Sequence, residues 1–329
     1  WIISSEKFMK PVRFINFLKV RASYGIVGND KYAGDRFLYM PNSWAGNSGA
    51  INWGTYQFGI GDTSGMLTDA HELSNGNPVV SWEKCSKQNY GLELKMFDYR
   101  FSMVLDVFFE HRWDILTTRN TLPSITSVKL PLMNLGIVNN KGYELQLGWN
   151  DKVGEFGYNI NANMSFARNK IIYKDEVIPN EPYMAETGNS TGRFYGYMFD
   201  RFLQESDFDA SGKIDPELPT MAIGNPKPGD VLYKDLNGDG KVDGDDCTYF
   251  GWGTRPEYVF GVTAGLNWKG LSFSMQWTGA THASRLLSGE YREPFGTTNS
   301  RAMLQYLADG RWTPENAENA RFPRLTFSS

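Results

Sequence analysis

The sequence predicts an all-β chain whose long antiparallel strands form part of a large transmembrane β-barrel, and three observations lead to this prediction. Apolar and polar residues alternate over runs of about nine to eleven positions, which is the length that a tilted strand needs to cross an outer membrane. The connections between these runs are either very short or very long. No run of eighteen or more apolar residues occurs, so a transmembrane helix is not expected, whereas alternating strands remain compatible with a membrane.

The alternation is clearest in the segment RFSMVLDVFFE at residues 100–110. Phe101, Met103 and Leu105 fall on one face of a strand there, while Asp106 and Glu110 fall on the other. Aromatic residues stand near the ends of such runs, as girdles at two membrane interfaces would. The same period of two occurs in five further segments, at residues 18–24, 141–150, 157–167, 257–268 and 271–277. The aromatic residues near their ends are Tyr143, Trp149, Tyr158, Phe166, Tyr258 and Trp268.

The connections favour a barrel over its main alternative, which is a soluble β-sandwich. GEFG at 154–157 and the KG turn at 269–270 are very short, whereas the spans 29–80 and 175–249 are long. Outer-membrane barrels have short periplasmic turns and long extracellular loops. Sandwich strands alternate in the same way but are nearer to five or six residues long, so strand length and connection asymmetry together favour the barrel.

Composition excludes one class of partner and leaves another question open. The 329 residues carry 33 basic and 37 acidic side chains, and no basic run interleaved with aromatics is present, so a nucleic-acid partner is not expected. Aromatic residues make up 15% of the chain, which suits a membrane interface or a sugar-binding surface.

Cys85 and Cys247 lack metal-ligand spacing, and whether they form a disulfide is left open. Because the chain begins without Met, we expect a piece of a longer protein.

The first long connection carries many aromatic residues among Gly, Asn and Ser. They suit stacking against sugar rings or contact with a partner protein, and equally they suit holding a long loop together. These residues are Tyr32, Tyr39, Trp44, Trp53, Tyr56 and Phe58.

The second long connection contains DLNGDGKVDGDD at residues 235–246, which has the oxygen spacing of an EF-hand calcium loop. Side-chain oxygens stand at the first, third, fifth, ninth and twelfth places, Gly240 is sixth, and the seventh residue would use its backbone carbonyl. The loop ends in Asp rather than the bidentate Glu, and Pro226 and Pro228 exclude an entering helix. We predict a structural Ca²⁺ site, with a solvated Asp/Gly turn as the alternative. Its ligands would be Asp235, Asn237, Asp239, Lys241, Asp243 and Asp246.

The sequence contains few residues or motifs that would support catalysis, and we expect neither catalytic nor cofactor-binding residues. His71, His111 and His282 are the only histidines, and neither G-x-S-x-G nor H-E-x-x-H occurs. Asp106 and Glu110 share a strand face, as a glycosidase pair would, but two carboxylates on a barrel strand are better explained as lining a hydrated lumen.

Five stretches, spread over nearly the whole chain, resemble the C-terminal half of the barrel in SusC/RagA-type TonB-dependent outer-membrane transporters of the Bacteroidetes. They are LKVRASYGIVGN at 18–29, WEKCSKQNYGLEL at 82–94, MNLGIVNNKGYELQL at 133–147, GDVLYKDLNGDGKVDGDD at 229–246 and RWTPENAENARFPRL at 311–325.

The resemblance implies a location in the outer membrane of a Gram-negative cell and import of a nutrient, which in this family is mostly a glycan and in some members a peptide. It implies three partners besides lipid: a SusD-like lipoprotein lid, TonB with its inner-membrane energising complex, and a glycan or peptide substrate. Residues 1–329 would form a partial barrel without plug or final strands, and 175–250 would form a long loop region that includes 235–246. The alternative function is that of a soluble or surface-exposed carbohydrate-binding β-domain without transport.

Overall fold

The computed structural model describes residues 1–31, 37–40, 75–121, 130–221, 224–292, 294–295 and 302–326, together with four short strands between residues 45 and 71. The chain forms two compact units, the first comprising 1–177, 186–191 and 257–281, and the second comprising 178–185, 192–256 and 282–329. Of the aromatic residues noted in the first long connection, Tyr32, Trp44 and Trp53 lie outside the described residues. The side chains of Tyr56 and Phe58 also lie outside them.

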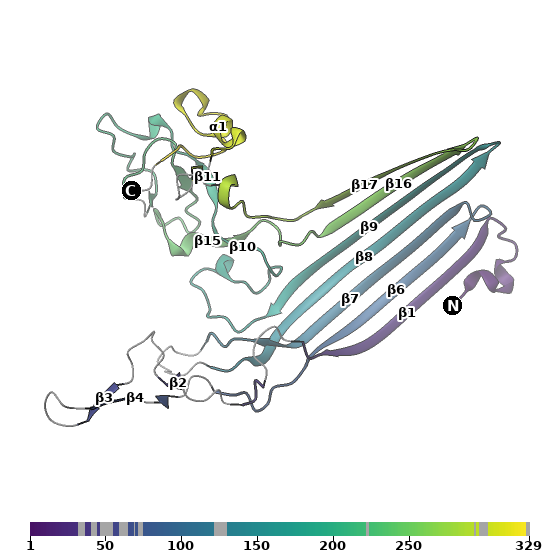
Figure 1. Ribbon diagram of the computed structural model, residues 1–329, viewed down its shortest axis with the longest axis horizontal. Coiled ribbons are helices and arrows are strands. Elements are labelled where there is room, and N and C mark those ends of the chain that lie inside the picture. Colours follow the sequence, from purple (N-terminus) through teal and green to yellow (C-terminus); the bar gives the residue numbers. More distant parts are fainter. Residues whose placement is uncertain are drawn as a thin grey trace. The chain divides into compact units, whose positions relative to one another are not determined.

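The first unit is built on one seven-stranded antiparallel sheet (Figure 1). Its strands follow the spatial order β1-β6-β7-β8-β9-β16-β17. Each strand therefore lies beside the next strand of this sheet along the chain, and the short strands between β1 and β6 and between β9 and β16 belong to other sheets. The bounds are β1 (Ile15–Asn29), β6 (Glu83–Met96), β7 (Phe101–Thr117), β8 (Met133–Val153), β9 (Phe156–Tyr173), β16 (Tyr258–Trp268) and β17 (Leu271–Thr281). Outside the sheet are η1 (Ile3–Ser5), η2 (Lys7–Met9), β2 (Ala45–Gly46), β3 (Thr55–Phe58), β4 (Gly65–Thr68) and β5 (Ala70–His71).

The register places one apolar row across all seven strands, which confirms the alternation predicted from the sequence. Because successive side chains of a strand point to opposite faces, the next row belongs to the other face and is mainly polar. The other sheets in the described part of the chain have only two strands each, whereas a sandwich requires a second sheet large enough to cover one face. The apolar row is Leu18, Leu94, Met103, Leu147, Ala162, Val262 and Trp277. The next row is Lys19, Glu93, Val104, Gln146, Asn163, Gly261 and Thr278.

The tight turns all lie at one end of the sheet and the long connections at the other. The turns at 97–100, 154–155 and 269–270 alternate along the chain with the connections 30–82, 118–132 and 174–257. Lys269 and Gly270 both have positive φ, 47° and 86°, as a type I′ hairpin turn requires. The second turn is shorter than predicted because Phe156 already pairs with Val153.

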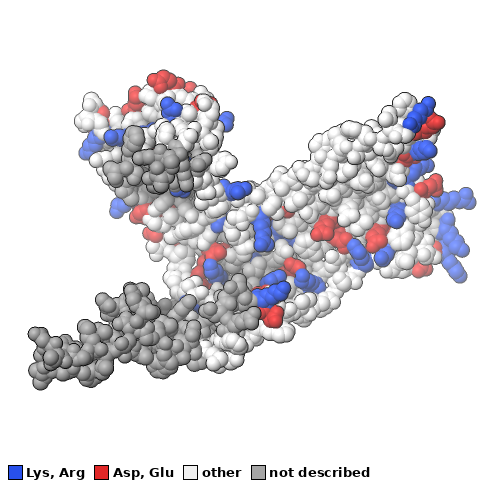
Figure 2. All heavy atoms as spheres, in the orientation of Figure 1, with Lys and Arg blue, Asp and Glu red and all other residues white. Residues whose placement is uncertain are grey.

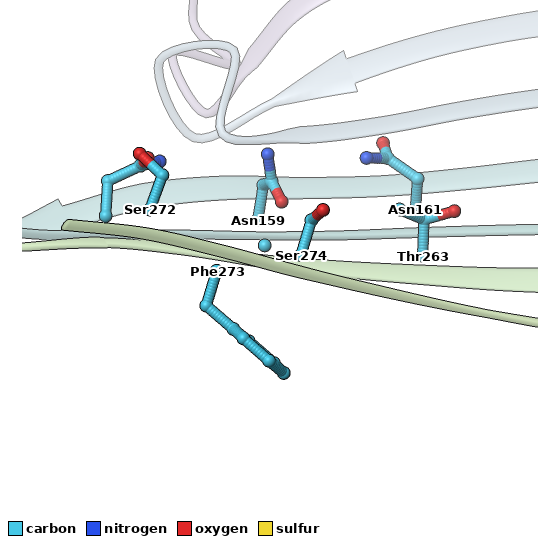
Figure 3. A pocket seen from close by; sticks show the side chains of 8 residues that line it. Asn159, Asn161, Thr263, Ser272, Phe273 and Ser274 are labelled. Carbon is cyan, nitrogen blue, oxygen red and sulfur yellow. The ribbon is translucent and has the colours of Figure 1, made fainter.

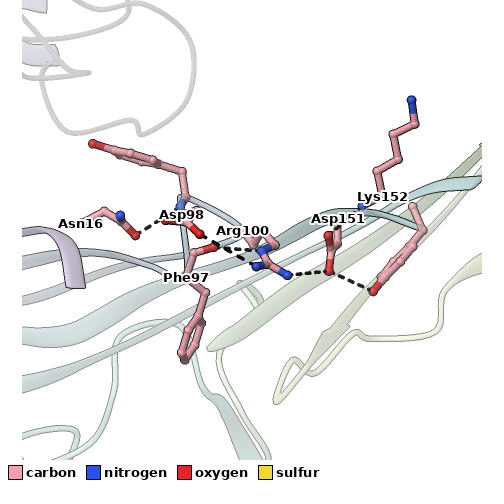
Figure 4. A network of polar contacts seen from close by, with 8 residues as sticks. Asn16, Phe97, Asp98, Arg100, Asp151 and Lys152 are labelled. Atoms are coloured by element: carbon pink, nitrogen blue, oxygen red, sulfur yellow. Dashed lines mark hydrogen bonds and ion pairs between the residues drawn. The ribbon is translucent and has the colours of Figure 1, made fainter. Parts of the chain in front are cut away.

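The turn between β6 and β7 is held by a polar network that reaches β1 and β8 (Figure 4). Phe97, Asp98 and Tyr99 all have positive φ, an uncommon conformation for residues other than glycine. Asn16 accepts a hydrogen bond from the backbone N of Tyr99 at 3.2 Å. Arg100 donates to the Phe97 carbonyl at 3.0 Å and to the Asp151 carboxylate at 3.3 Å. The network therefore compensates the strained turn by tying it to β1 and β8.

Aromatic side chains form two rows on the apolar face, as predicted for interfacial girdles. Phe166 lies 4.6 Å from Tyr258 and 5.5 Å from Tyr143, measured between ring centroids. Near the tight turns, Trp149 lies 6.4 Å from Phe101. Tyr143 and Trp149 are six residues apart on β8, which corresponds to about 20 Å at the rise of an antiparallel strand. That span is close to the height of the apolar band of an outer-membrane barrel. Among the described residues, no helix is both long and apolar enough to cross a membrane.

Within the described residues, the second unit consists of short strand pairs, one short α-helix, five 3-10 helices and a small core of its own. Leu203, Leu232 and Val242 are almost fully buried there, as are Leu307 and Trp312. The strands are β10 (Phe194–Tyr197) paired with β15 (Cys247–Phe250), β11 (Phe199–Phe202) paired with β13 (Val231–Tyr233), and β12 (Thr220–Met221) paired with β14 (Lys241–Val242). The helices are α1 (Gln305–Gly310), η3 (Pro182–Met184), η4 (Glu205–Asp207), η5 (Gly244–Asp246), η6 (Gly289–Tyr291) and η7 (Pro314–Asn316).

Candidate functional site

The polar face of the large sheet divides into a charged half and an uncharged half. The charged half lies on β1, β6 and β7, where opposite charges pair across neighbouring strands (Figure 2). Glu110, one of the two carboxylates noted in the sequence, pairs with Lys87 at 3.0 Å, and the other, Asp106, pairs with Arg21. Both carboxylates thus share the polar face, as predicted. The remaining pairs are Lys19–Glu93 at 3.3 Å, Arg21–Glu93 at 3.4 Å and Arg112–Glu83 at 2.9 Å.

The uncharged half lies on β9, β16 and β17. From residues 157 to 171 of β9, 259 to 267 of β16 and 272 to 280 of β17, every side chain on this face is neutral. Its polar members are amides and hydroxyls: Asn159, Asn161, Asn163, Ser165, Asn169, Thr263, Asn267, Ser272, Ser274, Gln276 and Thr278.

A hollow of about 290 Å³ lies in this uncharged half (Figure 3). The side chains of Asn159, Asn161 and Ser274 stand on the polar side of the sheet, whereas Phe273 points to the opposite side. A second hollow of about 250 Å³ continues toward β7 and β8, past Asn161 and Gln146. We refer to the polar residues that line the first hollow as the amide cradle: Asn159, Asn161, Thr263, Asn267, Ser272 and Ser274.

Glycines on the neighbouring strands make room for the amide side chains of β9. A Cβ at Gly265 would lie 2.3 Å from Oδ1 of Asn159, and one at Gly148 would lie 3.1 Å from Oδ1 of Asn161. The amide groups of Asn159 and Asn161 therefore lie directly over glycines, where a larger residue would displace them. Because the glycines have no side chain, the amide groups can lie close to the sheet and leave the space above them open.

Most polar groups of the amide cradle have no partner within the part of the chain that the structure describes. Ser272 donates to Oδ1 of Asn267 at 2.8 Å, but the side chains of Asn159, Asn161, Thr263 and Ser274 make no hydrogen bond to another described residue. Each amide can donate twice and accept, and each hydroxyl can do both. The cradle can therefore bind water or a ligand that is rich in neutral donors and acceptors.

In the second unit, the predicted calcium loop is inserted into one side of a hairpin. β13 and β15 pair in turn with the continuous segment β10–β11: Tyr233 is opposite Phe199, and Cys247 is opposite Tyr197. The loop 234–246 leaves and rejoins between these two pairs, so its two ends are held next to each other. The sequence spacing identified the loop, but its place within a hairpin required the structure.

The side-chain oxygens of this loop accept hydrogen bonds from the loop's own backbone. Asp235 accepts from the N of Gly238 at 2.7 Å and of Gly240 at 2.8 Å, both of which have positive φ. Asp246 is fully buried and accepts from the N of Leu236 at 2.7 Å and of Asp243 at 2.8 Å. In three Asx turns a side-chain oxygen accepts a hydrogen bond from the backbone N two residues later: Asn237 from Asp239 at 3.0 Å, Asp239 from Lys241 at 2.9 Å, and Asp243 from Asp245 at 2.9 Å.

The chemistry of this donor set suits Ca²⁺, since every side-chain ligand is a hard oxygen. Within the described residues, however, no group of three or more His, Cys, Asp or Glu side chains is arranged to hold a metal ion. The six predicted ligands share one loop, and the five side chains among them already accept hydrogen bonds from backbone N–H groups. Calcium binding stays a prediction.

The other candidate reactive groups have ordinary structural contacts. Nδ1 of His111 lies 2.6 Å from the Asn139 amide oxygen, and the ring of His282 lies 4.2 Å from that of Trp252. The side chain of His71 lies outside the described residues. Cys85 and Cys247 are free thiols, and burial raises the pKa of the Cys247 thiol despite a hydrogen bond to Tyr197.

Sequence reasoning recognised the polar faces of these strands but not the amide cradle. The four residues Thr263, Asn267, Ser272 and Ser274 occupy the polar positions of the segments 257–268 and 271–277, and alternation alone does not indicate that these positions form one site. The signal that could have found them is the complete absence of charge at every second position, in contrast to β6 and β7.

Two curated proteins resemble this chain over most of its length. TonB-dependent receptor P26 of Formosa agariphila is 29% identical over 331 residues, covering 96% of this chain and 30% of the receptor. TonB-dependent receptor SusC of Bacteroides thetaiotaomicron is 26% identical over 294 residues, covering 83% of this chain and 26% of SusC. The chain thus spans less than a third of the length of these relatives. No family model matches the chain.

Solved structures share the fold. The RagAB peptide importer in its open-open state matches all of this chain and 33% of the solved chain, with a TM-score of 0.69 and 20% identity. A structure of the RagAB peptide transporter matches with a TM-score of 0.66 at the same identity. At this identity the match concerns the fold alone, and the seven strands of the large sheet form an open sheet that does not close into a barrel.

Proposed function

We infer from these relatives that the chain belongs to the SusC/RagA type of TonB-dependent transporters of the Gram-negative outer membrane. On this premise we propose that it forms part of the barrel wall through which a glycan is imported. TonB and its inner-membrane complex would supply the energy, and a SusD-like lipoprotein would close the barrel from outside. The barrel wall itself would bind and guide cargo and carry out no chemical step.

The observation that carries this proposal is the opposite character of the two sheet faces. The apolar row that crosses all seven strands suits contact with lipid, and the opposite face carries paired charges, amides and hydroxyls that suit a hydrated lumen. A soluble carbohydrate-binding domain would expose this wide apolar face to water, where it would promote aggregation. The asymmetry between tight turns and long connections supports the same topology.

The test is uptake by intact cells that lack the gene. We expect them to lose growth on at least one glycan as sole carbon source, while growth on mixed peptides is unchanged. Expression of the full-length protein from a plasmid should restore growth only when TonB is functional. Detergent extraction of that protein should co-purify a lipoprotein. Loss of growth on peptides alone would replace glycan by peptide as the cargo, and growth without TonB would contradict the proposal.

We further propose that Ca²⁺ stiffens the loop 235–246 and so reduces the entropy of an extracellular connection rich in glycine and aspartate. Its ligand spacing supports this role, with Asp235, Asn237, Asp239, Asp243 and Asp246 supplying side-chain oxygens and Lys241 a carbonyl. The Asx turns already order the loop, so the ion would have to replace part of those backbone contacts.

Calcium should protect the loop from trypsin, which cuts after Lys234 and Lys241. We expect slower cleavage at Lys241 in Ca²⁺ than in EGTA, because bound metal favours the closed loop. The rate can be followed by mass spectrometry of the fragments, with Mg²⁺ as the control ion and cleavage after Lys213, outside the loop, as the internal standard. Equal rates with Ca²⁺ and EGTA would show that the Asx turns alone hold the loop.

A further inference from the structure

The polar face of the large sheet has a charged half and an uncharged half, which offer different contacts to a ligand. On β1, β6 and β7 the side chains form ion pairs with one another across the strands. On β9, β16 and β17 the same face holds only neutral groups, and the hollow of about 290 Å³ lies there. A charged ligand group placed in this hollow would lose water without gaining an ion partner from these strands, which is costly. Charged side chains, those of Asp151, Lys152, Glu155 and Lys269, line a separate hollow of about 470 Å³ at the tight-turn end, which shares Asn159, Asn267 and Ser272 with the first.

The groups that line the hollow have unused hydrogen-bonding capacity. The side chains of Asn159, Asn161, Thr263 and Ser274 have no partner among the described residues, and they come from three adjacent strands. Asn161 and Thr263 are direct cross-strand partners, so an amide and a hydroxyl stand side by side. Such a mixed array of donors and acceptors complements a chain of hydroxyl groups, each of which also donates and accepts.

We propose that the amide cradle is a binding site on the inner wall for an uncharged, polyhydroxylated chain, and that its lack of charge selects against acidic chains and peptides. The site rests on the proposed import function and adds to it the residues that contact the cargo and the charge of that cargo. Gly265 and Gly148 contribute by leaving room for the amides to lie low, so that a chain can pass above them.

The test compares two matched double variants of the full-length protein. Asn161→Leu/Thr263→Val removes an amide and a hydroxyl from the cradle at paired positions. Asn89→Leu/Ser23→Ala removes the same two groups from a cross-strand pair on the same face, within the charged half. Heat-modifiable mobility in gels confirms that each variant is folded.

Binding is measured by calorimetry in detergent with neutral hexasaccharides of glucose, mannose and xylose, an oligogalacturonate of the same length, and a hexapeptide. TonB-dependent uptake of the same probes by cells is measured in parallel. We expect a neutral hexasaccharide to bind and to be imported, and the cradle variant to bind it about tenfold more weakly, as expected for two lost neutral hydrogen bonds. The Asn89/Ser23 variant should bind like the wild type.

The outcomes separate the cradle from the import function. Import of a neutral probe with equal affinity in both variants would overturn the cradle and leave import intact, as would preferred binding of the oligogalacturonate or the hexapeptide. No TonB-dependent import of any probe would overturn both.

Discussion

The Leu145→Arg variant should fail to assemble in the outer membrane, whereas the Gln146→Arg variant should assemble and stay folded. Leu145 lies between Leu105 and Met164 on the apolar face, between the two aromatic rows. An arginine on the lipid face near the middle of the bilayer costs about 2–4 kcal/mol, a large fraction of the net stability of a barrel. The fraction of heat-modifiable protein in outer membranes measures assembly.

Gln146 is the matched control because it is the next residue of β8 and points to the other face. It stands on the polar face with Glu144, so an added arginine there remains hydrated and near a carboxylate. Since a one-residue step along a strand exchanges lipid for lumen, the two variants differ only in the face that receives the charge. Equal assembly of both variants would contradict a lipid-facing role for the apolar row.

The faces of the strands could be predicted from the sequence because the period of two assigns every side chain once a strand is recognised. The pairing of β9 with β16 could not, because residues 174–257 separate them and alternation carries no information about which strand is the neighbour. The segment 175–250 was predicted as a long loop region. Most of it lies in a second unit whose paired strands are only two to four residues long, too short to give a periodic signal.

The amide cradle illustrates the same limit at the level of a site. The alternation over residues 157–167 puts Asn159 and Asn161 on the polar face, yet a site arises only when Thr263 and Ser274 are brought beside them by two further strand pairings. The spacing of Asp235 to Asp246 was recognised, but carboxylates accept backbone N–H groups as readily as they bind a cation, so spacing alone does not decide between the two roles.

The Asp246→Ala variant should open the loop 235–246 while the rest of the second unit stays folded. Asp246 is fully buried, and its two oxygens bind the N–H groups of Leu236 and Asp243, which lie near opposite ends of the loop. Each hydrogen bond to a charged group contributes about 1.5–3 kcal/mol, so losing both should cost the closed loop about 3 kcal/mol or more. Amide hydrogen exchange of Leu236 and Asp243, measured in EGTA, should become about a hundredfold faster.

Asp239→Ala provides the comparison, because Asp239 is exposed and its side chain binds a single backbone group, the N of Lys241, at 2.9 Å. In EGTA it should cost less than about 1.5 kcal/mol and leave exchange at Leu236 nearly unchanged, since the bond that it removes is local. The strand pairs on either side of the loop, Tyr233 with Phe199 and Cys247 with Tyr197, hold the loop ends in both variants. Opening should therefore remain local and require no unfolding of the unit. If the two variants accelerated exchange equally, the buried carboxylate would not be what closes the loop.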